Sequence, residues 1–242
     1  MRLFLFLALL VLAGLEPASA QTISIDLGQD NGLTQRLLQI IALLTVLSLA
    51  PSILVMVTSF TRIVVVLSLL RTAIGLQTAP PNAVMISLAL FLSAFVMAPV
   101  FERAYDDGVK PLMDGTIEMD QAFERASEPF HDFMLKQVRE SDVELFQGLA
   151  NEPAPETPQE LSLRVLVPAF MISELRRAFE IGFLLYLPFL IIDLVIASVL
   201  MSMGMMMLPP VVISLPFKLI FFVLVDGWQL IAGSLVQSFG VT

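Results

Sequence analysis

The chain has 242 residues, a net charge of −9, a hydrophobic share of 57% and a mean hydropathy of +0.87. This is far more apolar material than one soluble core needs, which indicates a membrane or membrane-complex protein. Cysteine is absent and His131 is the single histidine, so disulfides, thiolate catalysis and metal sites built on cysteine or histidine clusters are excluded. We therefore expect neither a metal nor a cofactor.

The first 20 residues are expected to be a cleavable signal peptide. Arg2 supplies a positive charge, residues 3–15 are an apolar run, and Ala18-Ser19-Ala20 matches the small-x-small cleavage pattern. Cleavage after Ala20 would leave Gln21 as the first residue. The alternative is an uncleaved anchor, although the run is shorter than the ~20 residues of a membrane span.

Four apolar regions follow the leader, and most are interrupted in ways that suit a lipid-facing helix poorly. The regions are 37–70, 82–101, 181–203 and 211–236. The interruptions are Pro51 and Arg62 in the first region, Pro188 and Asp193 in the third, and Pro216, Lys218 and Asp226 in the fourth. Proline breaks helices, and charges are expensive in hydrocarbon. These four charged residues are therefore expected to be buried charges that face protein or water and have partners.

Four crossings would place both ends of the mature chain and the segment 102–180 on the outer side of the membrane. Arg62 and Arg71 then lie on the cytoplasmic side, as the positive-inside rule prefers. Arg176 and Arg177 run against this rule. Helical spacing pairs Arg176 with Glu180 and Arg177 with Glu174, which would neutralise both arginines locally.

The segment from Glu102 to Arg164 carries the whole net charge of the protein. It holds 15 acidic and 6 basic residues, whereas the remainder of the chain is balanced. Apolar residues recur within it at helical intervals; they are Phe123, Phe130, Phe133, Met134, Val138 and Leu145. We expect a small helical domain outside the cytoplasm over residues 102–172, with a solvated acidic face that argues against nucleic acid and anionic lipid as partners.

Residues 201–210 read MSMGMMMLPP, which is the least expected composition in the chain. Gly204 admits backbone conformations that other residues resist, and Pro209 and Pro210 prevent a helix from running through. A reversal near 205 or 206 puts Asp193 and Lys218 at equal distances from the bend. An ion pair between them within one chain is expected, and pairing with neighbouring chains is the open alternative.

A similar break is expected at Ala79-Pro80-Pro81, after which Asn82 would cap a helix starting at Ala83 or Val84. Catalytic motifs are absent, including Walker, GxGxxG, HExxH and GxSxG patterns. His131 lies in the acidic segment with no nucleophile near it in sequence, so a solvated or structural role is expected. Enzyme activity is the weaker class of explanation, and a channel or transporter component fits better.

The sequence resembles the flagellar type III export gate family FliP (FliP/SctR). The likeness rests on TSFTRIVVVLSLLRTAIG, APPNAVMISLALFLSAFVMAP, SELRRAFEIGFLLYLPFLIIDLVIASVLMSMGMMMLPP and ISLPFKLIFFVLVDGWQLIAGSLVQSF. It covers nearly all of the chain from about residue 37. Members that serve injectisomes share these motifs but usually lack a signal peptide, so the N-terminus favours the flagellar branch.

This resemblance implies a ring of five copies that joins FliQ and FliR to form the entry pore of the export apparatus. FlhB and FlhA would act with it, unfolded flagellar proteins would pass through it, and its place would be the inner membrane within the flagellar basal body. The methionine loop of the family constricts the pore as a gasket, and its positions match Met205, Met206 and Met207. Met201 and Met203 are candidates for the same lining or for packing at the helix end. The family's charged positions in the apolar helices match Glu174, Asp193 and Lys218.

The expected fold is all-α: broken apolar helices form helical hairpins, and the acidic domain is inserted between the two hydrophobic halves. The expected divisions are 1–20, 21–101, 102–172 and 173–242. Two further functions remain open. A proton-coupled transporter would use Asp193 or Asp226 as its titrating carboxylate, and a structural scaffold would tolerate any apolar residue of similar volume in place of the methionines.

Overall fold

The structure, a computed structural model, describes residues 32–240 apart from 154, 156 and 206, so the expected signal peptide lies outside the described residues. The described residues up to Ser48 and those from Leu49 onward belong to two units, and the core lies in the second. Only helices and connecting segments occur in the described part of the chain, which confirms the all-α class.

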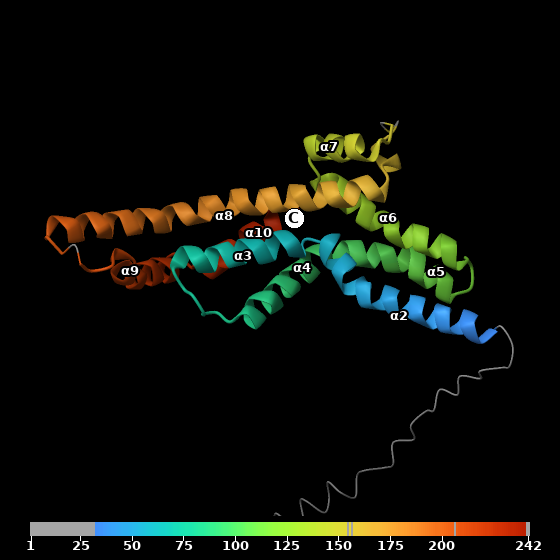
Figure 1. The fold of residues 1–242 in the computed structure, drawn as a ribbon, viewed down its shortest axis with the longest axis horizontal. Coiled ribbons are helices and arrows are strands. Elements are labelled where there is room, and N and C mark those ends of the chain that lie inside the picture. The colour runs from blue at the N-terminus through green and yellow to red at the C-terminus, as the bar shows by residue number, and fades with distance from the viewer. Residues whose placement is uncertain (1–31, 154, 156, 206, 241–242) are drawn as a thin grey trace, which may run out of the picture. The chain divides into compact units, whose positions relative to one another are not determined.

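Figure 1 labels the elements of the fold in chain order. They are α2 (Gly32–Met56), α3 (Phe60–Ile74), α4 (Asn82–Ala104), the π-helical turn η1 (Tyr105–Val109), α5 (Lys110–Met113), α6 (Met119–Gln137), α7 (Glu140–Ala150), the 3₁₀ turn η2 (Pro158–Glu160), α8 (Leu163–Ser202), α9 (Pro210–Leu224) and α10 (Gly227–Gln237).

The core of the second unit is built around α3. This helix buries residues on most of its circumference, including Arg62, Ile63, Val66, Leu67 and Leu70. At 15 residues it is about 22 Å long, because an α-helix rises 1.5 Å per residue. Helix α3 is therefore a packed core helix inside the protein, and not half of a lipid-facing span.

The first apolar region is broken at residues 57–59 and not at Pro51, so the prediction for Pro51 is wrong. Helix α2 continues through that proline to Met56, and α3 begins at Phe60. Thr58, Ser59 and Thr61 are buried around the break, where the Ser59 hydroxyl lies 2.9 Å from the hydroxyl of Ser93 on α4. The break therefore lies where buried hydroxyls bond the backbone oxygen of Val55 and the side chain of Ser93, and not at the local proline.

Helix α8 runs without interruption for 40 residues, so the predicted break at Pro188 is also wrong. Pro168 and Pro188 both lie inside it, and each removes only one backbone donor from the helix. At about 60 Å, α8 is roughly twice as long as a bilayer hydrocarbon core is thick. The helix also passes through the expected division between residues 172 and 173, and the division of the chain into domains stays a prediction.

Helix α4 begins at Asn82, but Asn82 does not cap it as expected. The N-cap is Pro81, and the Asn82 side chain makes no capping hydrogen bond. Its Oδ1 accepts a hydrogen bond of 2.6 Å from Arg71 Nη1, which also donates to the backbone oxygen of Pro80. A charged donor displaces the weaker local cap and fixes the turn between α3 and α4.

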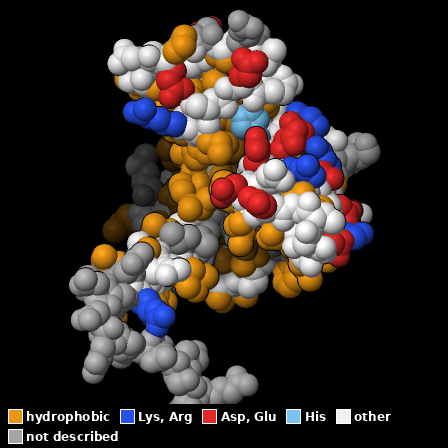
Figure 2. Space-filling model, turned by 90° about the vertical axis from the view of Figure 1, so that its right-hand side faces the viewer, with side chains coloured by type: hydrophobic (Ala, Val, Ile, Leu, Met, Phe, Trp, Pro, Cys, Tyr) orange, Lys and Arg blue, Asp and Glu red, His pale blue; other side chains and the backbone are white. Residues whose placement is uncertain are grey.

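The acidic segment folds into η1 and α5 to α7, and α6 and α7 pack on α8. Of its predicted apolar face, Phe133 and Met134 are buried, while Phe123 and Leu145 are exposed. Figure 2 shows acidic side chains beside apolar ones on one face of the molecule. The inward side of this segment thus contributes to the core, and its outward side combines charge with unburied apolar surface.

The described residues contain two helical stretches that are long and apolar enough to cross a membrane. They are Asn82–Met113 and Leu163–Ser202, and a third results if α9 and α10, bent by 63°, count as one span. This differs from the four crossings expected, because α3 serves as core. Arg62 is buried in that core, so it carries no information on membrane orientation.

Candidate functional site: the methionine loop and the buried charges

The chain reverses direction between Ser202 at the end of α8 and Pro210 at the start of α9 (Figure 1). Gly204 has φ +73°, a left-handed conformation that only glycine adopts readily. Its N–H donates to the Met201 oxygen and the Met205 N–H donates to the Leu200 oxygen, both at 3.0 Å. This pair of bonds is a Schellman motif, which satisfies the last carbonyls of α8 and ends the helix.

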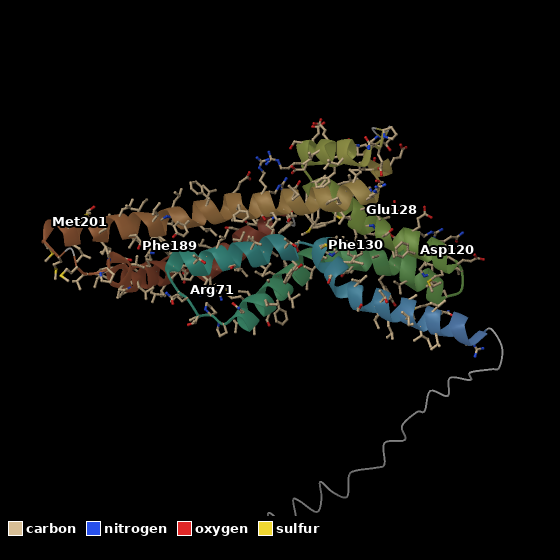
Figure 3. All side chains as sticks on the ribbon, viewed as in Figure 1. Arg71, Asp120, Glu128, Phe130, Phe189 and Met201 are labelled. Atoms are coloured by element: carbon tan, nitrogen blue, oxygen red, sulfur yellow. The ribbon has the colours of Figure 1, made fainter. Side chains whose placement is uncertain are left out.

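The methionines around this reversal are exposed in the chain. Met207 is 98% exposed, and Met201, Met203 and Met205 are also exposed. Met206 lies outside the described residues. Figure 3 shows sulfur atoms gathered at the end of α8 where Met201 is labelled, so the tip of the hairpin presents flexible thioether side chains and no charge.

An ion pair joins the two helices of the hairpin, as expected from the register of the bend. Lys218 Nζ donates to Asp193 Oδ2 at 2.7 Å and to the backbone oxygen of Ala73 at 3.2 Å. Ser214, fully buried, donates to Asp193 Oδ1 at 2.6 Å. Both carboxylate oxygens are satisfied within one chain, and the bonds tie α8 and α9 to the end of α3.

Arg62 is the most extensively bonded side chain of the core and is 1% exposed. Its guanidinium forms a bidentate pair with Glu174, in which Nε donates to Oε2 at 2.9 Å and Nη2 donates to Oε1. Two parallel donors on one carboxylate match the planar geometry of arginine, which makes this the stronger kind of ion pair. The pair joins α3 to α8 across 112 residues of sequence.

The remaining donors of Arg62 reach two further parts of the chain. Nη2 donates to Gln137 Oε1 at 3.0 Å, and Nη1 donates to the backbone and hydroxyl oxygens of Ser238 at 3.1 Å each. The guanidinium carbon lies 3.8 Å from the centre of the Phe239 ring. All five N–H groups of Arg62 therefore have acceptors, and one side chain links α3, α6, α8 and the end of α10.

Asp226 and His131 lie apart from these networks. Asp226 is exposed, with φ +49°, at the bend between α9 and α10, whereas a buried position was expected. His131 Nε2 lies 2.8 Å from the backbone oxygen of Leu161, which gives the histidine a structural partner. Neither residue lies beside a group with which it would form a catalytic or metal site, and the described residues contain no cluster of three potential metal ligands.

The uncharged polar residues that bond these buried charges were not predicted from the sequence. Gln137, Ser214 and Ser238 give no motif, because glutamine and serine are common on any solvated surface. A signal exists only for Ser214, which precedes Lys218 by four residues on the same helix and therefore lies on the same face as the charge.

Together these features define the class of the protein. It is an all-α membrane protein whose buried charges form ion pairs within the chain and whose exposed apolar hairpin, α8–α9, ends in a methionine loop. The model of the FliP family matches residues 43–235. The chain belongs to the FliP family.

Three relatives carry the name flagellar biosynthetic protein FliP. The chain is 66% identical to the protein of Caulobacter vibrioides over 226 residues, covering 92% of this chain and 85% of that protein. It is 50% identical to the protein of Rhizobium meliloti, with 96% of each chain covered, and 56% identical to that of Bacillus subtilis, with 83% of this chain and 91% of that protein covered. None of these names denotes an enzyme.

Proposed function

We propose that the chain is the pore-forming subunit of the flagellar protein export gate and that several copies surround the path of unfolded substrates. Family membership and the names of the relatives support a role in building the flagellum. The ring of five copies, the partners FliQ, FliR, FlhB and FlhA, and the place in the inner membrane are carried over from the resemblance. The outward position of the acidic domain is carried over from the topology expected from the sequence.

The observation that carries this proposal is the exposure of the α8–α9 hairpin. Beyond residue 180, α8 buries only Gly182, Phe189 and Leu200, and α9 buries only Ser214, Lys218 and Phe222. Large side chains such as Phe183, Ile191 and Leu224 are more than half exposed. An apolar surface of this extent must be covered by lipid or by other subunits, and copies of the same hairpin around an axis would cover it.

The methionine loop suits the constriction of such a pore. Methionine is flexible and polarizable, so Met205, Met206 and Met207 would yield to bulky segments of substrate and close again afterwards. Their side chains carry no charge that would retain a substrate, and an apolar constriction disfavours a continuous column of water. The loop would thus work as a gasket, with Met201 and Met203 extending the apolar lining.

The alternative of a proton-coupled transporter finds less support in the geometry. Asp193 is held by Lys218 and Ser214, which is the arrangement of a structural ion pair. Asp226 is exposed, and no other charged side chain of the described residues forms an ion pair with it. Loss of export in Asp193→Asn with normal assembly would favour the transporter.

The test is the ion conductance of membranes that contain the assembled complex. Replacing Met205, Met206 and Met207 by alanine is expected to raise the leak about tenfold or more, because the shorter side chains no longer close the path. Met119→Ala is the matched control, since Met119 is 69% exposed but lies in the acidic segment. An intact complex with unchanged conductance in the triple variant would remove the gasket role, and full function with leucine at all three positions would favour a scaffold.

A further inference from the structure

Four arginines gather where the charged part of α8 meets its apolar part. A surface cavity of about 460 Å³ is lined by Arg62, Arg139, Arg177, Glu180, Ile181 and Ser238. Arg176 lies beside it on the same helix and contacts Glu180 at 3.8 Å. The volume is within the ~300–1,000 Å³ typical of small-molecule sites.

Arg177 forms no ion pair with Glu174, the innermost carboxylate of this region, contrary to the expected pairing. Both Glu174 oxygens accept from Arg62. Arg177 Nη1 donates at 3.2 Å to Gln137 Oε1, the oxygen that also accepts from Arg62. Two guanidinium groups thus meet on one neutral oxygen, and among the described residues no carboxylate lies within 4.0 Å of Arg177.

The outer arginines share one glutamate. Glu180 lies 3.5 Å from Arg139 Nη1 and 3.8 Å from Arg176 Nε, and all three side chains are more than one-third exposed. Exposed pairs at such distances are weak and are easily replaced by a better anion. The cavity is thus lined by three arginines and one glutamate. Two further acids lie close by but do not line it: Asp142 is buried and bonded to Ser173 Oγ, and Glu140 is exposed.

An apolar surface begins directly beside these charges. After Glu180, α8 contains no charged residue until Asp193, and Phe179, Phe183 and Leu184 are each about 60% exposed. Arginines at the end of an apolar stretch are placed to meet phosphate groups at a membrane interface, and the guanidinium fork matches phosphate oxygens. The region thus combines an anion cradle with a surface for hydrocarbon chains.

We propose that this cavity binds the phosphate of an anionic phospholipid, with Arg139 and Arg177 donating to its oxygens and the acyl chains lying along α8. The acidic surplus of the chain does not oppose this binding, because the cavity is lined by three arginines and one glutamate and charges beyond about 10 Å are largely screened at 0.1 M salt. The lipid would supply the anion that Arg177 lacks. It would also cover part of α8 that the chain itself leaves exposed.

The test is lipid binding to the purified full-length chain in detergent, followed by native mass spectrometry. Phosphatidylglycerol is expected to bind, whereas diacylglycerol, which has the chains without the phosphate, is expected to bind at least tenfold more weakly. Inorganic phosphate at the same concentration is expected to displace little of the lipid. The proposal would be overturned if diacylglycerol bound as tightly as phosphatidylglycerol. It would also be overturned if inorganic phosphate displaced bound phosphatidylglycerol as efficiently as free phosphatidylglycerol does.

Substitutions locate the site. Arg177→Gln and Arg139→Gln are each expected to weaken phosphatidylglycerol binding about tenfold, and Arg177→Lys less, because lysine keeps the charge but loses the fork. Arg103→Gln is the control, since Arg103 is exposed, pairs with Asp132 and does not line the cavity. If Arg177→Gln fails to fold, phosphatidylglycerol binding by Arg139→Gln tests the proposal. Unchanged lipid binding in the folded variants would contradict the assignment. Loss of subunit association with lipid binding unchanged would also contradict it, and would indicate that a carboxylate of another copy binds these arginines.

Discussion

Helix α8 has a first half, residues 163–178, and a second half, residues 179–202, which the chain buries to different extents. Seven of the ten buried residues of this helix lie between Val165 and Ala178, and three lie in the following 24 residues. The first half carries Glu174, which is wholly buried and bonded to α3. The second half contacts α3 at Gly182 and α9 at Asp193, and it leaves most of its large side chains exposed.

This difference distinguishes the first half of α8, which the chain packs by itself, from the second half, whose exposed surface other molecules must cover. A fully buried charge with bidentate bonding indicates a region whose packing is finished within one chain, since an unpaired charge there is very unfavourable. Unburied phenylalanine, leucine and methionine side chains indicate a region whose packing is unfinished. In the proposed gate, the first half of α8 is the fixed part and the hairpin is the part that assembles around the pore.

The largest expected effect on the free energy of unfolding is in the first half of α8, whose packing is complete within one chain. Glu174→Gln leaves the Arg62 guanidinium buried without a counter-charge, which costs about 3–5 kcal/mol of stability. The measurement is the free energy of unfolding of the purified chain in detergent. Glu180→Gln is the matched control, because Glu180 also pairs with arginine but is 59% exposed, and its loss is expected to cost about 1 kcal/mol or less. Equal effects of the two substitutions would mean that the Arg62 pair is not closed off from water.

A smaller effect is expected at the boundary between the halves. A Cβ atom at Gly182 would lie 2.3 Å from Leu69 Cδ1 and 3.2 Å from Leu69 Cβ, so α8 and α3 are in close contact there. Gly182→Ala is expected to lower the free energy of unfolding by about 1–3 kcal/mol through overpacking. The same substitution at Gly148 on α7 meets no atom within 4 Å and is expected to stabilise by up to about 1 kcal/mol. A stabilising Gly182→Ala would show that the contact with Leu69 is looser than described.

Local features of the fold could be predicted from the sequence. The reversal at Gly204 and the two prolines depends on backbone preferences of the residues themselves, and the register of Asp193 and Lys218 follows from counting outward from that bend. The helical class follows from periodicity and composition. In each case the determining residues are close together in the chain.

Features that depend on distant partners could not be predicted in this way. Pro51 and Pro188 lie inside helices, since each removes only one backbone donor and the flanking turns keep theirs. Asn82 bonds Arg71 in place of the helix end, and Glu174 bonds Arg62 in place of the nearby Arg177. The competition is between a local partner and a remote one, and the sequence alone does not show which remote group is within reach. The exposure of the methionine loop likewise depends on the whole arrangement of α8 and α9.

Disulfide trapping tests most directly whether copies of the same chain, arranged around a common axis, cover the exposed second half of α8. The chain contains no cysteine, so Met207→Cys introduces a single thiol at a side chain that is 98% exposed at the tip of the hairpin. Val165→Cys, at a fully buried position in the finished half, is the matched control. After mild oxidation of membranes that contain the complex, we expect disulfide-linked dimers from Met207→Cys and single chains from Val165→Cys. Single chains from both variants, with the complex intact, would contradict the convergence of the methionine loops.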